Sequence, residues 1–295
     1  MSTASPQMLP FSGVAVLGPG LLGGSVAMAV RQCMPECKLS LWARRPQPLE
    51  LAQQLGIATH TTLDAQEAVR GAQLVILATP IGTFPQLVQA ILPALEPGAL
   101  VTDVGSVKAS VHDSAGQILT EKGHFFIGSH PMAGAEKQGL EHARADLLRG
   151  AMVALTNPHG VPADKLARLA DFWQKLGCRT HVMTPAGHDT TVAHISHVPH
   201  ILAALCARSA VQGDAPAEDL RLLASTGFRD TTRVSSGSPT MWADILCANA
   251  PAIRAALAAC ISDLQAIENL LEQRDEQALT SWLKQAKDAR ESVQD

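Results

Sequence analysis

A histidine-bearing loop between two glycines is the first candidate for chemistry in this chain. The segment GSHPMAGAEKQG (128–139) holds His130, Glu136 and Lys137, and it follows the apolar residues 125–127, which predict a strand. Open α/β sheets bind their ligands just beyond the carboxyl ends of their strands. A neutral imidazole in that place is able to accept a proton from an alcohol while hydride leaves the same carbon. His130 is therefore a candidate general base, and the alternative is a histidine that makes only local hydrogen bonds.

A second group of histidines lies in HDTTVAHISHVPH (188–200). The group is His188, His194, His197 and His200, and spacings of three place the last three near one face of a predicted helix. A metal site is the alternative, but the motif H-E-x-x-H is absent and Pro199 disturbs the helix. We therefore expect no metal, and we expect one or two of these histidines to hydrogen-bond an anionic substrate.

The segment GFRDTTR (227–233) supplies two arginines, Arg229 and Arg233. A guanidinium group binds a carboxylate through two parallel hydrogen bonds. Solvated surface arginines are the alternative. On a helical domain that faces the sheet, an arginine of this segment is a candidate ligand for a substrate carboxylate.

A glycine-rich turn predicts a nucleotide site near the N-terminus. Gly18, Gly20 and Gly23 fit G-x-G-x-x-G, and the motif follows a predicted strand and opens a helix at Leu21 and Leu22. The first glycine permits the tight turn, the second lets the backbone approach a pyrophosphate, and the third lets helix and strand pack closely. Amide groups at the start of the helix then face the phosphates. A glycine turn that binds nothing is the alternative.

The ribose end of this site favours NADP slightly over NAD. The acidic residue expected about 20 positions after the glycines is missing, and Arg44 and Arg45 follow the second predicted strand instead. An arginine there is able to hold a 2′-phosphate, whereas solvated arginines and NAD are the alternative. Thr79, Pro80 and Ser106 lie at the ends of further predicted strands, so we expect them beside the cofactor.

Alternating apolar strands and helices predict a parallel, doubly wound sheet in the first half of the chain. The expected strands are 13–18, 38–43, 74–80, 99–106 and 125–131, and the first expected helix is 21–32. Strands at 151–156 and 179–184, around a helix at 162–177, extend this pattern.

After Pro185 the pattern is helical. A long helix is expected from about 240 to 273, because apolar residues recur there at spacings of three and four. Such a stripe is typical of internal core, and its length also allows a dimer formed through helices. The predicted domains are 12–184 and 185–295.

Composition excludes several classes of protein. The 295 residues are 46% hydrophobic and 17% charged with a net charge of −4, which predicts a sizeable core and argues against nucleic acid as a partner. The N-terminal residues lack the basic segment followed by an apolar segment that is typical of a signal peptide, and no apolar run reaches 18 residues. We therefore expect a cytoplasmic protein without a membrane span. The six cysteines are scattered along the chain, so we expect them to be reduced thiols. The absence of tyrosine excludes a dehydrogenase mechanism that uses a Tyr–Lys pair.

Taken together, these motifs resemble the prephenate/arogenate (cyclohexadienyl) dehydrogenases of tyrosine biosynthesis. The resemblance runs in order from about Val14 to Glu272 through GPGLLGGS, DVGSVK, GSHPMAGAEKQG, HISHVPH and GFRDTTR…PTMW. The glycine motif is generic, whereas the histidine and arginine motifs are specific to this family. The resemblance implies a Rossmann-type α/β domain followed by an all-α dimerisation domain, a homodimer, and NAD or NADP as cofactor.

The resemblance also implies roles for individual residues. His130 would accept the proton of the substrate's ring hydroxyl, and Ser106 would orient that hydroxyl and the nicotinamide. Arg233 would bind a substrate carboxylate with His200 nearby. The pocket would be gated by Glu136 and lined by Trp242, and His197 would be structural or support the site. The implied reaction is oxidative decarboxylation of prephenate, arogenate or both, and the presence of His200 favours prephenate or dual use.

Three rival functions remain open from the sequence. A β-hydroxyacid dehydrogenase shares the same outline, but it usually relies on a catalytic lysine that the SHVPH segment lacks. A nucleotide-binding sensor without turnover and a metal-dependent hydrolase built on the histidine cluster are the other two.

Overall fold

The computed structural model describes residues 9–135 and 137–294. Contacts between residues divide the chain into two compact units, and the boundary in the sequence lies between Asn249 and Ala250. This division does not bear on the domain boundary expected between residues 184 and 185, which stays a prediction.

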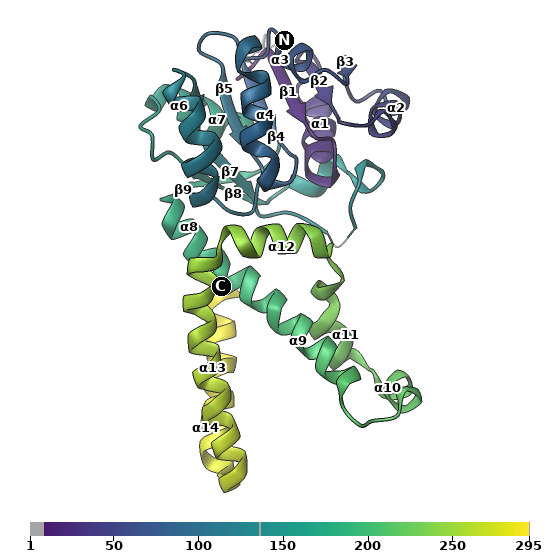
Figure 1. Cartoon of the computed structure of the whole chain (residues 1–295), viewed down its shortest axis with the longest axis vertical. Coiled ribbons are helices and arrows are strands. Elements are labelled where there is room, and N and C mark those ends of the chain that lie inside the picture. The colour runs from purple at the N-terminus through teal and green to yellow at the C-terminus, as the bar shows by residue number, and fades with distance from the viewer. Residues whose placement is uncertain (1–8, 136, 295) are drawn as a thin grey trace, which may run out of the picture. The chain divides into compact units, whose positions relative to one another are not determined.

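The first unit contains a six-stranded sheet in which every neighbouring pair of strands is parallel (Figure 1), as the sequence predicted. The strand order is β3-β2-β1-β4-β5-β6. The order therefore reverses between β1 and β4, and such a reversal opens a crevice at the carboxyl ends of the two strands. The strands are β1 (Gly13–Leu17), β2 (Lys38–Trp42), β3 (His60–Thr62), β4 (Leu74–Leu77), β5 (Leu100–Asp103) and β6 (Phe125–Phe126).

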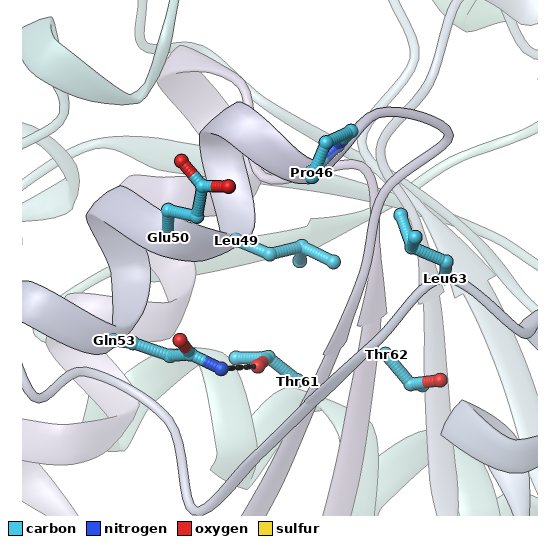
Figure 2. Close-up of a pocket in the computed structure, with 7 residues that line it drawn as sticks. All are labelled: Pro46, Leu49, Glu50, Gln53, Thr61, Thr62 and Leu63. Carbon is cyan, nitrogen blue, oxygen red and sulfur yellow. Dashed lines mark hydrogen bonds between the residues drawn. The ribbon is translucent and has the colours of Figure 1, made fainter.

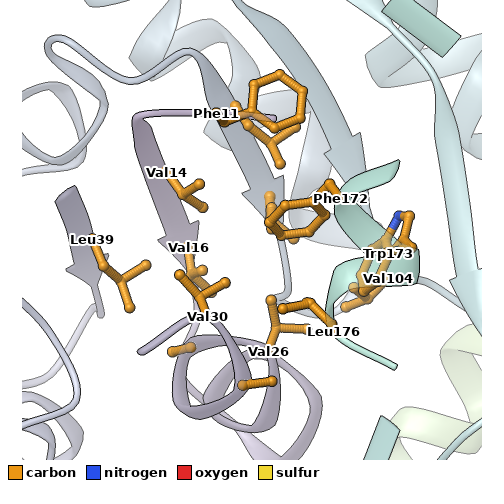
Figure 3. Close-up of a cluster of buried hydrophobic side chains, with 14 of the residues drawn as sticks. Phe11, Val14, Val16, Val26, Val30, Leu39, Val104, Phe172, Trp173 and Leu176 are labelled. Carbon is orange, nitrogen blue, oxygen red and sulfur yellow. The ribbon is translucent and has the colours of Figure 1, made fainter. Parts of the chain in front are cut away.

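Successive apolar side chains of β1 point to opposite faces of the sheet and pack into two different hydrophobic clusters. Val14 and Val16 join one buried cluster, whereas Ala15 and Leu17 join another. Figure 3 shows Val14 and Val16 facing Val26 of helix α1 in the first cluster. Because both faces are apolar, helices must cover both sides of the sheet. The connecting helices are α1 (Leu21–Cys33), α2 (Pro46–Gln54), α3 (Ala65–Val69), η1 (Ile81–Thr83), α4 (Phe84–Ile91), η2 (Leu92–Ala94), α5 (Ala109–Val111), the π-helical turn η3 (His112–Gly116), α6 (Gln117–Glu121) and α7 (Ala163–Lys175).

A second, three-stranded sheet corrects one expectation. The apolar run 125–131 forms two strands, β6 and β7 (Gly128–Pro131), and β7 pairs antiparallel with β8 (Met152–Thr156). β8 in turn pairs with β9 (Arg179–Val182), so the strands at 151–156 and 179–184 do not extend the parallel sheet. Gly128 permits this change of partner, because a Cβ atom there would lie 2.5 Å from Oγ1 of Thr156 on β8. Two further 3₁₀ turns, η4 (Leu140–His142) and η5 (Ala145–Leu148), connect β7 to β8.

The rest of the first unit is helical, with a break at the histidine segment. A π-helical turn, η6 (Ala193–His197), joins α8 (Pro185–Val192) to α9 (Val198–Gln212). Pro199 lies at the start of α9 and has no N–H to donate to the preceding turn. The wider turn leaves His194 exposed while His197 and His200 are buried, so the three do not share one face as expected. The remaining helices of this unit are α10 (Ala217–Leu223), α11 (Thr226–Thr232), η7 (Arg233–Ser236) and α12 (Pro239–Ala248).

The second unit is a pair of helices, α13 (Ala250–Gln273) and α14 (Glu276–Gln294). The single helix expected over 240–273 is therefore interrupted at Asn249, which ends α12 and precedes Pro251. By length and composition alone, α13 is long and apolar enough to span a membrane, with a mean hydropathy of 1.2 over an 18-residue window. The sequence reading did not anticipate this property.

Candidate active site

The glycine loop after β1 has the geometry of a nucleotide-binding turn. Gly18 has a φ of 106°, and a Cβ atom there would lie 2.8 Å from the carbonyl oxygen of Ala78. A Cβ atom on Gly23 would lie 2.2 Å from the carbonyl oxygen of Gly18. At Gly20, by contrast, a Cβ atom would meet nothing within 4 Å. Two glycines are thus required by close packing, and the third faces open space.

The start of α1 is prepared for an anion. Gly20 is its N-cap residue and supplies no side-chain hydrogen bond, and the first turn contains no acidic residue. Leu21 and Leu22 are half-buried beside the loop. Backbone N–H groups at a helix N-terminus bind phosphates well, so this loop fits a dinucleotide pyrophosphate.

The residues at the predicted ribose end are open to solvent. Arg44 and Arg45 are exposed directly after β2, and Ala43 between the strand and the arginines is buried. Trp42 donates a hydrogen bond from its indole Nε1 to the carbonyl of Leu63, 3.0 Å away, and so ties the end of β2 to the chain beyond β3.

A pocket of about 360 Å³ opens beside this corner between α2 and the end of β3 (Figure 2). It contains none of the residues predicted to bind cofactor. Its lining consists of Pro46, Leu49, Glu50, Gln53, Thr61, Thr62 and Leu63.

Thr79, Pro80 and Ser106 lie where the sequence placed them, beyond the carboxyl ends of two adjacent strands. Thr79 and Pro80 follow β4, and the Oγ1 atoms of Thr79 and Thr83 are 2.8 Å apart. Ser106 follows β5 and is half-buried. Since β1, β4 and β5 are neighbours in the sheet, these residues share one edge with the glycine loop.

A buried ion pair stabilises the chain just after β5. The ammonium group of Lys108 contacts the carboxylate of Asp103, and it also donates to the carbonyl of Ser129, 2.9 Å away. Burial lowers the pKa of Lys108 and raises the pKa of Asp103, while the attraction between the two charges opposes both shifts. The carboxylate of Asp103 also accepts backbone N–H groups from Gly105 and Ser129. Three donors thus surround one carboxylate.

These contacts connect β5 to the strand that carries His130. Ser129 donates its backbone N–H to Asp103 at 3.1 Å, and its hydroxyl lies 2.7 Å from that of Thr102. The indole of Trp173 donates to the same hydroxyl at 3.1 Å. His130 is consequently held beside the carboxyl end of β5, although in a strand of the second sheet.

His130 is the first member of a chain of three polar side chains. Its Nδ1 lies 2.8 Å from Nε2 of His188, and Nδ1 of His188 lies 2.7 Å from Oδ1 of Asp189. The pKa of His130 is lowered well below its ordinary value, first by burial and then by the charge of Lys108 and the neighbouring imidazoles. His130 is therefore neutral at neutral pH, as a proton acceptor must be.

Asp189 joins the helical segment to the α/β domain. Its two carboxylate oxygens accept the backbone N–H groups of Lys108 and Ala109, each at 2.8 Å. Its carbonyl accepts a hydrogen bond from the side-chain amide of Asn249 at 2.8 Å, and the same amide lies 3.0 Å from Nδ1 of His197.

His197 and His200 both contact Trp242. The ring of His200 stacks on the indole with centroids 3.5 Å apart and planes 12° apart, whereas His197 meets it edge to face at 6.1 Å. Burial lowers the pKa of His197 to about 4. Burial also lowers the pKa of His200, against a hydrogen bond with the Val234 backbone that raises it. The structure thus groups three of the predicted substrate-binding residues.

The predicted arginines lie near this group in sequence but are open to solvent. Arg233 begins η7, next to Val234, and it is exposed, as is Arg229. Glu136, the predicted gate, lies outside the described residues. Among residues 9–135 and 137–294, no three His, Cys, Asp or Glu side chains are grouped so as to hold a metal ion.

Sequence reasoning missed four residues that shape this site. Asp103 and Lys108 lie five residues apart within DVGSVK, and opposite charges so close in sequence are the one available hint of their ion pair. Asp189 follows His188 directly in sequence, but that adjacency alone did not indicate that its carboxylate orients the imidazole. Asn249 gave no comparable signal, because its partners His197 and Asp189 are more than 50 residues away.

Comparison with known proteins gives one consistent result. Residues 26–182 match the family model of the prephenate dehydrogenase nucleotide-binding domain, and residues 184–285 match that of the prephenate dehydrogenase dimerization domain. A cyclohexadienyl dehydrogenase of Zymomonas mobilis is 33% identical over 285 residues, which are 96% of each chain.

Solved structures agree with these matches. A crystal structure of prephenate dehydrogenase from A. aeolicus, in complex with hydroxyphenyl propionate and NAD⁺, superposes with a TM-score of 0.88 at 28% identity, covering 99% of this chain and all of the other. An arogenate dehydrogenase from Synechocystis superposes with a TM-score of 0.80 at 30% identity, covering 95% of this chain and 99% of the other.

Proposed function

Since the chain belongs to the prephenate dehydrogenase family of NAD(P)-dependent oxidoreductases, we propose that it oxidatively decarboxylates prephenate, arogenate or both, with His130 as general base. The observation that carries this proposal is the placement of His130. A neutral imidazole is held beside the carboxyl end of β5, on the edge of the sheet that also carries the glycine loop and Ser106.

In the proposed reaction His130 accepts the proton of the ring hydroxyl, and Ser106 orients that hydroxyl. The bound nicotinamide supplies the acceptor for the hydride that leaves the carbon bearing the hydroxyl. The ring carboxylate departs as carbon dioxide and the ring becomes aromatic. Since aromatisation provides the driving force, the chain mainly has to position groups and remove one proton.

The helical segment supplies the proposed contacts to the rest of the substrate. Arg233 binds a carboxylate, and the stacked pair of His200 and Trp242 forms one wall of the pocket with His197 behind it. The presence of His200 supports use of prephenate or of both substrates.

For the cofactor, we propose NADP, with NAD as the alternative. Two exposed arginines, Arg44 and Arg45, follow β2, and the intervening Ala43 carries no carboxylate that would repel a 2′-phosphate.

The match to a dimerization domain implies a homodimer, and we propose that the helical segment forms its interface. Ile261, Leu264 and Leu271 of α13 are each more than half exposed in the single chain, and a partner subunit would cover them. This assignment also accounts for the apolar character of α13. We propose a cytoplasmic location as well, which six free thiols suit.

The function is tested by measuring absorbance at 340 nm with prephenate and with arogenate, each with NAD and with NADP. We expect reduced cofactor to form with at least one pair, and we expect His130→Asn to lower kcat by about 10²–10⁴-fold with little change in cofactor affinity. A nucleotide-binding sensor would form no reduced cofactor with any pair. An unchanged rate in His130→Asn would remove that residue from the mechanism.

A further inference from the structure

The three side chains that begin at His130 have a defined direction of hydrogen bonding. That direction can be derived from Asp189, whose partners are fixed by the backbone. Its Oδ1 accepts the N–H of Lys108 and its Oδ2 accepts the N–H of Ala109. Both oxygens therefore receive donors that cannot change role, and the side chain is placed as an ionised acceptor.

His188 must then present a donor to this carboxylate. Its Nδ1 is 2.7 Å from Oδ1 of Asp189, so Nδ1 carries the hydrogen. A neutral imidazole has one N–H and one bare nitrogen. Nε2 of neutral His188 is therefore bare and acts as an acceptor.

The acceptor on His188 determines which ring nitrogen of His130 carries its hydrogen. Its Nδ1 is 2.8 Å from the bare Nε2 of His188, so Nδ1 of His130 carries the hydrogen. Nε2 of His130 is then left with a free lone pair. That nitrogen is the one able to accept a proton, because Nδ1 is already committed to His188.

We propose that His188 and Asp189 are positioning residues that hold His130 in the tautomer whose Nε2 accepts the substrate's proton. The inference rests on the proposed role of His130 as general base. It assigns a role to the first histidine of HDTTVAHISHVPH and to the aspartate that follows it. Both side chains are buried, so they act on the reaction through His130.

Burial makes this arrangement well defined. His188 is 1% exposed and Asp189 is 4% exposed, so water does not compete for their hydrogen bonds. Among the described residues, Lys108, His188 and His197 are the charged or titratable groups that act on His130, and Asp189 contacts His188. If Nε2 of His188 carried the hydrogen instead, it would donate to Nδ1 of His130. Nδ1 of His130 would then be the bare nitrogen, and Nε2 of His130 would be protonated. In serine proteases a wrong tautomer of the catalytic histidine costs about 10⁴-fold in kcat.

Two substitutions of His188 distinguish a role in orienting the His130 imidazole from a role in filling space. His188→Leu fills space but cannot accept the hydrogen of His130 Nδ1. His188→Gln offers an amide N–H to Asp189 and an amide oxygen to His130, so it preserves the direction of both bonds. We expect the Leu variant to lose about 10²–10⁴-fold in kcat, the Gln variant to retain at least about a tenth of wild-type kcat, and KM for the substrate to change little in both.

A double variant tests whether His188 acts through His130. His130→Asn combined with His188→Leu should be no slower than His130→Asn alone, because an orienting residue has no effect without the group it orients. If the kcat of the double variant fell by the product of the two single losses, the inference would be overturned. Equal kcat values for His188→Leu and His188→Gln would overturn it as well. Full activity of His130→Asn alone would instead refute the proposed role of His130 as general base, on which the inference rests.

A measurement on the unaltered protein covers the case in which the Leu variant fails to fold. In protein labelled with ¹⁵N-histidine, side-chain nitrogen shifts distinguish protonated from bare ring nitrogens. We expect the signal that disappears in His130→Asn to show a protonated Nδ1 and a bare Nε2 at pH 8. The reverse pattern would overturn the inference.

Discussion

The ammonium of Lys108 and the carboxylate of Asp103 form an ion pair in which both side chains are 0% exposed. Removing one partner of such a pair leaves an uncompensated charge in the interior, which costs about 3–5 kcal/mol. This pair also connects the end of β5 to β7, because Lys108 donates to Ser129 and Asp103 accepts from it. The pair therefore stabilises the segment on which Ser106 and His130 are placed.

We predict that Lys108→Met lowers the free energy of unfolding by about 3–5 kcal/mol. The double variant Lys108→Met with Asp103→Asn should lose less than the sum of the two single losses, because the second change removes the unpaired charge. Urea unfolding of the four proteins measures both quantities. Additive losses would show that the two groups do not interact.

The glycine loop allows a matched pair of substitutions. Gly20→Ala places a methyl group in open space, so we predict a free energy of unfolding within about 0.5 kcal/mol of wild type. If a pyrophosphate occupies that space, the same methyl group should raise the dissociation constant of the cofactor at least about tenfold. Gly23→Ala places a methyl group 2.2 Å from the Gly18 carbonyl, and it should cost about 1–3 kcal/mol of stability as well.

Cofactor titration by fluorescence and thermal unfolding of both variants distinguish these effects. A Gly20→Ala protein that binds cofactor as wild type does would place the pyrophosphate elsewhere.

Local patterns predicted much of this fold and less of its site. The parallel strands and the glycine turn follow from short apolar runs and close packing, which neighbouring residues determine. The edge strand β3, with the sequence HTT, was not predicted because it is short and polar. The exposure of His194 depends on a π-helical turn. The role of Asp189 depends on backbone donors about 80 residues earlier, and one sequence does not specify such a contact.

The arginines after β2 should determine cofactor preference. A hydrogen bond to a charged group contributes about 1.5–3 kcal/mol, so we predict that Arg44→Ala with Arg45→Ala lowers kcat/KM for NADP about 10–100-fold. The value for NAD should change little, because NAD has no 2′-phosphate. Arg70→Ala, which removes an exposed arginine elsewhere, is the matched control. Equal losses with both cofactors would show that Arg44 and Arg45 do not bind the 2′-phosphate.

His112 should make stability depend on pH independently of catalysis. Its ring is buried, Nε2 lies 2.8 Å from the hydroxyl of Thr156, and burial lowers its pKa to about 3. In the unfolded chain the pKa returns to about 6.5. Between these values the unfolded state binds a proton that the folded state does not. Stability is therefore full above pH 6.5 and falls as the pH drops towards 3, by up to about 1.4 kcal/mol per pH unit.

The contribution of His112 is isolated by comparison with His112→Gln, which has no titrating ring. His197, whose pKa is about 4, adds the same kind of slope to both proteins and cancels in the difference. We predict that wild type loses about 2 kcal/mol more than the variant between pH 7 and pH 5. Urea unfolding at pH 7, 6 and 5 measures this difference. Parallel curves for the two proteins would mean that His112 takes up its proton without unfolding.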